Sequence, residues 1–152
     1  MGDGMIISFL GHSDFREDAR IKERLLFLLR REARGEDVSF FLGGYGGFDA
    51  FARRCAKEYQ KENPLCSLVF VTPYLITAQR EEGTRGKEYD EVLYPPLESV
   101  PPRYAISHRN RYMAERADLI VAYVAHKWGG AYQALTHARR LNKRIINLAE
   151  EE

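Results

Sequence analysis

The stretch FLGGYGGFDAFARRCA, residues 41–56, joins an apolar run to a helical pattern through four glycines: Gly43, Gly44, Gly46 and Gly47. Glycine loses the most conformational freedom on folding, so this cluster indicates a backbone that needs space free of Cβ atoms. Either the loop is only a tight strand-to-helix turn, or its N–H groups reach an anion at the start of the helix. The spacing G-G-Y-G-G is not the dinucleotide fingerprint and favours neither interpretation.

The rest of the chain alternates between strand-like and helical patterns. Continuous apolar runs, typical of parallel strands covered on both faces, occupy residues 5–11, 38–44, 67–73, 118–124 and 144–149. Apolar stripes at helical spacing lie between some of them, within residues 21–29, 51–59 and 131–141. The alternation predicts a single α/β domain over residues 1–152. Its core would be a doubly wound, mainly parallel sheet of about five strands with helices on both faces.

An irregular insertion, at about residues 76–102, interrupts this alternation. It is polar, carries four of the six prolines, and is longer than a plain crossover. Within it, the sequence DEVLYP (residues 90–95) is a candidate for a short extra strand, and a helix is expected to begin near Arg103 or Tyr104. Because the insertion follows the third strand at its carboxyl end, where open α/β sheets bind ligands, we interpret it as a functional lid.

Composition excludes several classes of function. The chain has 152 residues, with 23 Lys and Arg against 22 Asp and Glu, so its net charge is +1. This balance gives no global attraction to nucleic acid or to a membrane, and neither is expected as a partner. No apolar segment is long enough to span a bilayer, and the first residues lack the basic region of a signal peptide. Cys55 and Cys66 have no metal-ligand or redox spacing, so we expect no metal site, reduced buried thiols and a cytoplasmic location.

Two further loops follow predicted strands and carry groups suited to an anionic ligand. GHSDF (residues 11–15) ends the first run, and its His12 and Ser13 offer hydrogen-bond donors; His12 is also a candidate base. The alternative for His12 is a merely exposed side chain. HKWGG (residues 126–130) repeats the strand–glycine–helix arrangement with Gly129 and Gly130. Two such turns at one edge of a sheet would flank a single pocket.

An arginine and two aromatic side chains complete the candidate site. Arg109 lies on a predicted helix and suits bidentate phosphate binding; the alternative is a solvated basic face in which Arg111 pairs with Glu115. Tyr45 and Trp128 offer stacking faces for a base, with core packing as the alternative for each.

Taken in order, these motifs resemble the SLOG superfamily, the group that unites the DNA-processing protein DprA with the LOG nucleotide hydrolases. GGYGGFDAFARRCA is similar to the DprA-type glycine loop followed by Asp and a helix of small residues. RNRYMAERADLIVAYV, followed by GGAYQALTHA, resembles the second half of that pattern. GHSDF is similar to the first loop of small bacterial SLOG proteins with Gly-His and Arg-Asn-Arg motifs. The resemblance implies a Rossmann-like fold, a nucleotide-type ligand at the carboxyl edge, no required cofactor, and a homo-oligomer, most simply a dimer.

The ligand-binding residues that we expect share a position at that edge: Gly11, His12, Ser13, Gly43, Gly44, Tyr45, Gly46, Gly47, Asp49, Arg109, Asn110, Trp128, Gly129 and Gly130. The chain departs from the LOG pattern Pro-Gly-Gly-x-Gly-Thr-x-x-Glu, whose glutamate is catalytic, because Thr136 stands at that position. Asn110 also stands where LOG enzymes have lysine. Phosphoribohydrolase activity is therefore not expected.

The sequence favours binding of a nucleotide or a nucleotide-derived molecule, as a sensor or carrier. An enzyme acting on N-glycosidic bonds, a nucleotide hydrolase or a deoxyribosyltransferase-like protein, is the alternative. That chemistry needs a carboxylate, for which Asp49, Glu98 and Glu115 are the candidates and Asp49 the best placed. A scaffold with a vestigial pocket is the third possibility.

Overall fold

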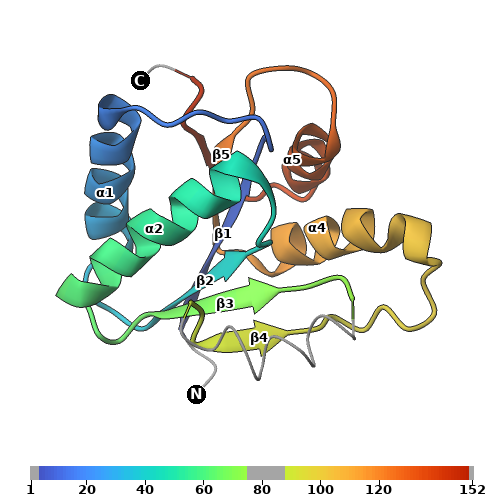
Figure 1. Cartoon of the computed structure of the whole chain (residues 1–152), viewed down its shortest axis with the longest axis horizontal. Coiled ribbons are helices and arrows are strands. Elements are labelled where there is room, and N and C mark those ends of the chain that lie inside the picture. The colour runs from blue at the N-terminus through green and yellow to red at the C-terminus, as the bar shows by residue number, and fades with distance from the viewer. Residues whose placement is uncertain (1–3, 75–87, 151–152) are drawn as a thin grey trace.

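Six parallel strands form one sheet in the order β4-β3-β2-β1-β5-β6 (Figure 1). The computed structural model describes residues 4–74 and 88–150. The strands of that part are β1 (Met5–Gly11), β2 (Val38–Leu42), β3 (Ser67–Val71), β4 (Glu91–Leu93), β5 (Leu119–Tyr123) and β6 (Ile145–Asn147). Its helices are α1 (Ala19–Ala33), α2 (Gly46–Glu62), α4 (Ala105–Arg116) and α5 (Gly130–Arg140), with a 3-10 turn at Pro102–Tyr104.

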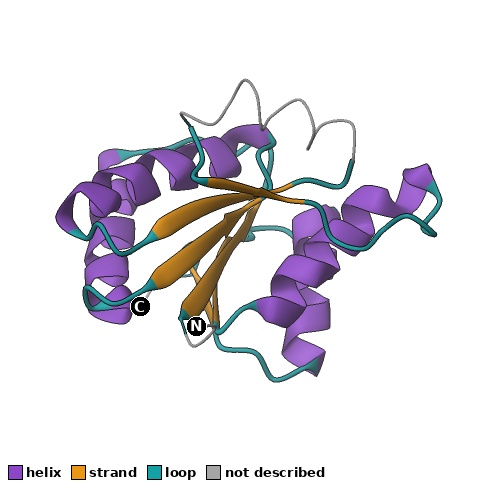
Figure 2. Ribbon diagram, turned by 90° about the horizontal axis from the view of Figure 1, so that it is seen from below, coloured by secondary structure: helices purple, strands orange, loops and turns teal. Residues whose placement is uncertain are grey.

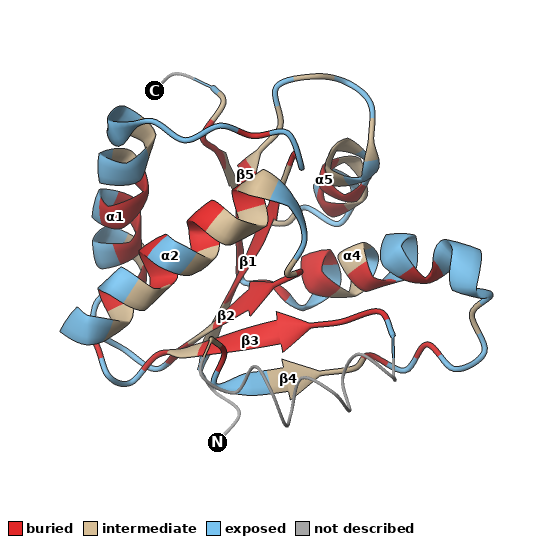
Figure 3. Cartoon of the chain, viewed as in Figure 1, coloured by how far each residue is buried: buried red, intermediate tan, exposed pale blue. Residues whose placement is uncertain are grey.

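The helices cover both faces of the sheet (Figure 2). Side chains of one face, such as Ile7 and Phe9, pack with α1 and α2. Side chains of the other face, such as Leu10 and Ile120, pack with α4 and α5. A strand directs successive side chains to opposite faces, so strands buried on both faces read as continuous apolar runs. Figure 3 shows the result, with buried strands between helices whose outward faces are exposed. The predicted doubly wound α/β fold is therefore confirmed.

Local signals in the sequence account for where the helices begin. The Asp18 carboxylate accepts a hydrogen bond from the Ile21 N–H at 2.9 Å and caps α1. The 3-10 turn begins at Pro102 and leads directly into α4, which confirms the helix start expected near Arg103 or Tyr104. None of the helices in the described ranges is both long and apolar enough to cross a membrane.

The insertion adds the sixth strand. Residues 91–93 form β4, which pairs with β3 through Phe70 and Val92, so the candidate extra strand is confirmed and the count of about five becomes six. Both cysteines are buried and free, as expected. The insertion that we interpret as a lid, at about residues 76–102, includes residues 76–87, which lie outside the described residues, so the lid stays a prediction.

The order of the strands creates a crevice at the carboxyl edge. The chain runs outward from β1 to β4 and then returns to β5 on the other side of β1. The connections that follow β1 and β5 consequently leave toward opposite faces of the sheet, where α1 and α5 lie (Figure 2). Open α/β sheets bind ligands at such a switch point.

Candidate functional site

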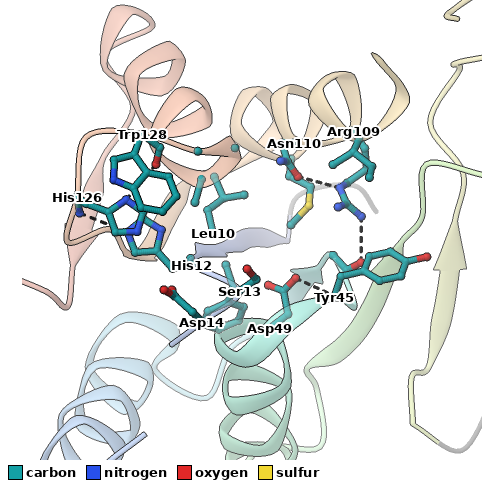
Figure 4. A pocket seen from close by; sticks show the side chains of 18 residues that line it. Leu10, His12, Ser13, Asp14, Tyr45, Asp49, Arg109, Asn110, His126 and Trp128 are labelled. Atoms are coloured by element: carbon teal, nitrogen blue, oxygen red, sulfur yellow. Dashed lines mark hydrogen bonds between the residues drawn. The ribbon is translucent and has the colours of Figure 1, made fainter. Parts of the chain in front are cut away.

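A cavity of about 300 Å³ opens at this switch point, between the loops after β1, β2 and β5, with α4 as one wall (Figure 4). Eleven of the fourteen predicted residues line it: Gly11, His12, Ser13, Gly43, Tyr45, Asp49, Arg109, Asn110, Trp128, Gly129 and Gly130. Asp14, Ile106, Met113, His126 and Ala131 line it as well and were not predicted. The four sequence motifs therefore converge on one cavity, as their order along the sheet edge predicts.

Most of the first glycine loop serves packing rather than the cavity. A Cβ atom at Gly46 would lie 2.7 Å from the Cα of Ser13, and one at Gly47 would lie 2.4 Å from the carbonyl oxygen of Phe15. The Gly47 N–H donates to the carbonyl of Ser13 at 2.7 Å. The start of α2 thus packs directly on the loop after β1. Gly44 does not line the cavity either, and a Cβ atom there would overlap the ring of Phe70.

Only Gly43 of these four glycines lines the cavity. A Cβ atom there would lie 3.1 Å from both the guanidinium carbon of Arg109 and Oδ2 of Asp49. Our interpretation of the whole loop as room for a ligand is therefore corrected. Gly43 leaves room for two charged side chains, and the other three allow close packing.

Arg109 connects α4 to the carboxyl ends of two strands. Its Nη1 donates to the carbonyls of Gly43 at 2.9 Å and Val71 at 2.8 Å, and its Nε donates to Oδ1 of Asn110 at 2.9 Å. The side chain is 4% exposed, and its guanidinium lies 5.8 Å from the centre of the Tyr45 ring. These bonds commit much of Arg109 to the fold, while its positive charge remains in the wall of the cavity.

Asp49 places a carboxyl group in the cavity with an unusual affinity for protons. It lies in the first turn of α2, and its Oδ2 accepts a hydrogen bond from the Tyr45 N–H at 3.1 Å. Burial raises the pKa of Asp49 to about 7, although the Tyr45 N–H and the Arg109 charge act to lower it. Near neutral pH the carboxyl group is therefore present in both protonation states, as a general acid or base requires.

Three rings form a stack along one side of the cavity, which we call the ring stack: His12, His126 and Trp128 (Figure 4). The ring centres of His12 and His126 are 3.6 Å apart, and those of His126 and Trp128 are 3.7 Å apart. Trp128 is 67% exposed and Tyr45 is 48% exposed, so neither is a core residue. An exposed indole at a cavity mouth is suited to stacking on a planar ligand.

His12 holds the ring stack in place instead of offering a free base. Its Nε2 accepts the N–H of Ala125 at 2.9 Å, which fixes the ring against the loop after β5. Burial, with a further contribution from His126, lowers the pKa of His12. The imidazole is therefore neutral at pH 7, and its acceptor nitrogen is occupied. His126 was not predicted, although its position almost directly after the apolar run 118–124 was a signal that could have found it.

The start of α5 supplies backbone N–H donors next to Trp128, at the end of the ring stack farther from His12. Gly129 adopts φ 95° and precedes the helix, and no side chain caps it. The first N–H groups of a helix have no partner within the helix and favour an anion. Gly129, Gly130 and Ala131 all line the cavity.

The cavity contains two carboxylates among the described residues, Asp14 and Asp49. Glu98 and Glu115, the other candidates, do not line it; Glu115 instead contacts Nε2 of His137 at 2.7 Å. Thr136 does not line it either, and its hydroxyl donates to the carbonyl of Tyr132. In residues 4–74 and 88–150, His, Cys, Asp and Glu side chains form no group of three that could hold a metal ion.

Comparison with known proteins identifies the fold. No family model and no curated protein sequence matches the chain. Solved structures do. DNA processing protein A (DprA) from Helicobacter pylori matches with a TM-score of 0.63 and 16% identity, over 93% of this chain and 63% of that one. DprA from Streptococcus pneumoniae matches with a TM-score of 0.61 and 13% identity, over 93% of this chain and 49% of that one.

A third match is the Moco carrier protein from Chlamydomonas reinhardtii. Its TM-score is 0.58 at 16% identity, and the match covers 99% of this chain and 79% of that one. This chain spans less than two thirds of either DprA protein. The H. pylori protein binds single-stranded DNA, so the shared fold gives no support to our expectation that nucleic acid is not a partner. The six parallel strands, the helices on both faces and these matches together show that the chain shares the Rossmann-like fold of these proteins.

Proposed function

We propose that the chain binds a nucleotide-type small molecule in the cavity at the carboxyl edge of its sheet, as a sensor or carrier. One observation carries this proposal: the uncapped start of α5 and the exposed face of Trp128 border the same cavity. The free N–H groups suit a phosphate, and the indole suits a base. Arg109 contributes long-range attraction from the cavity wall.

A carrier or sensor role fits the chemistry of the cavity better than LOG-type hydrolysis does. Thr136 has no carboxylate to offer, and its hydroxyl is used within α5. A protein named as a carrier of Moco shares the fold, which supports small-molecule carriage as a use of this architecture. We propose no additional cofactor. Homo-oligomerisation stays a prediction.

The test separates ligand binding from folding. Ala131→Asp places a carboxylate in the first turn of α5, where the helix dipole favours it, yet its charge repels a phosphate. Ala131→Asn is the uncharged control, and Trp128→Ala removes the exposed stacking face. In a thermal-shift screen of nucleotides, cyclic nucleotides, ADP-ribose derivatives and nucleosides, a ligand at 100 times its Kd adds about 2.7 kcal/mol of stability.

We expect a nucleotide to stabilise the native protein and the Ala131→Asn variant, and not the Ala131→Asp variant. Trp128→Ala should lower the affinity for the same ligand by about tenfold, since stacking on an aromatic ring contributes about 1 to 3 kcal/mol. A folded protein that no compound stabilises would favour the scaffold interpretation.

Asp49 keeps the enzyme alternative in place. Its carboxyl group lines the cavity with a pKa of about 7, which suits a general acid or base at an N-glycosidic bond. Incubation with each nucleoside monophosphate, followed by chromatography for free base, tests this alternative. Release of base that is lost in Asp49→Asn would replace the carrier proposal with a hydrolase.

A further inference from the structure

A second cavity, of about 260 Å³, adjoins the first between the starts of α4 and α5. Its polar lining consists of Arg103, Ser107, Asn110, Arg111 and Gln133. Ile106, Asn110 and Gly130 line both cavities, so the two adjoin at these residues. We call this second cavity the α4–α5 groove.

The α4–α5 groove carries two positive charges that no acidic side chain of the described part neutralises. Under the alternative interpretation of α4 as a solvated basic face, Arg111 would pair with Glu115 one turn along the helix, but Glu115 contacts His137 instead, at 2.7 Å. Arg103 lies over the ring of Tyr104, 4.9 Å from its centre, and makes no ion pair with a described residue. Both arginines are exposed and are free to bind an anion.

Asn110 provides a fixed donor between the two cavities. Its Oδ1 accepts the Nε–H of Arg109, which sets the orientation of the amide. The amide nitrogen consequently faces the start of α5, where a Cβ atom at Gly130 would lie 3.5 Å from it. Hydrogen-bond donors of Asn110, Arg111 and Arg103 therefore line the α4–α5 groove together with the first turn of α5.

We propose that the α4–α5 groove is a second anion subsite, and that the ligand is a nucleoside diphosphate or one of its esters. This inference rests on the proposed function: the phosphate next to the nucleoside lies at the start of α5, and the second phosphate reaches the groove past Asn110. A ligand with one phosphate would leave both arginines unused. The charge of the groove thus specifies the length of the anionic part of the ligand.

Paired probes test the subsite. Nucleoside monophosphates and the matching diphosphates are titrated against the native protein and the double variant Arg103→Gln/Arg111→Gln, by calorimetry at fixed ionic strength. The double variant Arg139→Gln/Arg140→Gln, at the far end of α5 and outside both cavities, removes the same two charges and controls for the loss of net charge. The exposed positions of Arg103 and Arg111 make these variants mild for folding.

We expect the Arg103→Gln/Arg111→Gln variant to bind the diphosphate with about tenfold lower affinity than the native protein does. Its affinity for the monophosphate should stay within about twofold of the native value. The Arg139→Gln/Arg140→Gln control should bind both nucleotides as the native protein does. If the Arg103→Gln/Arg111→Gln variant changed the affinities for the monophosphate and the diphosphate equally, or changed neither, the second subsite would be refuted. The proposal that the first cavity binds a nucleotide would be unaffected. Failure of every probe to bind the native protein would overturn the proposed function together with this inference.

Discussion

Asp49 makes the stability of this protein depend on pH in an unusual direction. An unfolded aspartate loses its proton near pH 4, whereas the folded Asp49, with a pKa of about 7, keeps its proton longer. Between these values the folded state holds more protons than the unfolded state. Its free energy of unfolding therefore falls as pH rises from about 4 to about 7, and stays lowered above that.

Asp49→Asn should remove this dependence. Asparagine keeps an oxygen that can accept the Tyr45 N–H, and it cannot ionise. Relative to the native protein, we expect the variant to gain about 1 to 3 kcal/mol between pH 4 and pH 8, because one pKa unit is about 1.4 kcal/mol and the partial exposure of Asp49 reduces the full effect. Urea unfolding of both proteins at the two pH values measures the gain. A constant difference would contradict the raised pKa.

Arg109 shows which part of a residue's role the sequence reveals. The motif around it predicted a functional arginine in the pocket, and the structure places it in the cavity wall. Its bonds to the carbonyls of Gly43 and Val71 were not predictable, because they join segments far apart in the chain. The side chain is therefore more structural than the motif indicates, and Arg109→Ala is a poor probe of ligand binding.

At the scale of elements, the start of α2 packs closely against the backbone of the loop after β1. Gly47→Ala would bring a methyl group to 2.4 Å from the backbone oxygen of Phe15, and backbone cannot move aside cheaply. We expect a loss of about 1 to 3 kcal/mol in the free energy of unfolding. Gly130→Ala is the matched control at the start of α5, since its methyl group meets only the Asn110 amide nitrogen, at 3.5 Å. Similar urea midpoints for the two variants would refute the packing role of Gly47.

Periodicity predicted the elements well, for a physical reason. Strands buried on both faces are apolar throughout, so all five predicted runs contain a strand. The short β4 was weaker as a signal, because Glu91 is exposed and the other two residues are only half-buried. The ring stack could not be predicted at all. It depends on how the loops after β1 and β5 meet, and no periodic pattern records that contact.

At the scale of the whole molecule, one sheet serves two hydrophobic cores. Residues of β1 and β5 contribute to both cores. If either layer of helices detached from the sheet, the same strands would be exposed to water. We expect a single cooperative unfolding transition, with coincident urea curves by far-ultraviolet circular dichroism and by tyrosine fluorescence. Separate midpoints for the two signals would show that the layers unfold independently.

The topology also explains why the site could be predicted better than any single motif allows. Each motif alone is compatible with an ordinary turn or a solvated helix. Parallel strands bring their carboxyl ends to one edge, so loops that follow β1, β2 and β5 must meet there. The order of the motifs therefore contained information that their spacing did not.

Trp128 is the only tryptophan of the chain, and it lies against His126 at the mouth of the cavity. All indole emission from this protein consequently originates at one place. A molecule that stacks on the indole would change both the intensity and the wavelength of this emission. The fluorescence of Trp128 should therefore report whether the cavity is occupied by a ligand, without an added label.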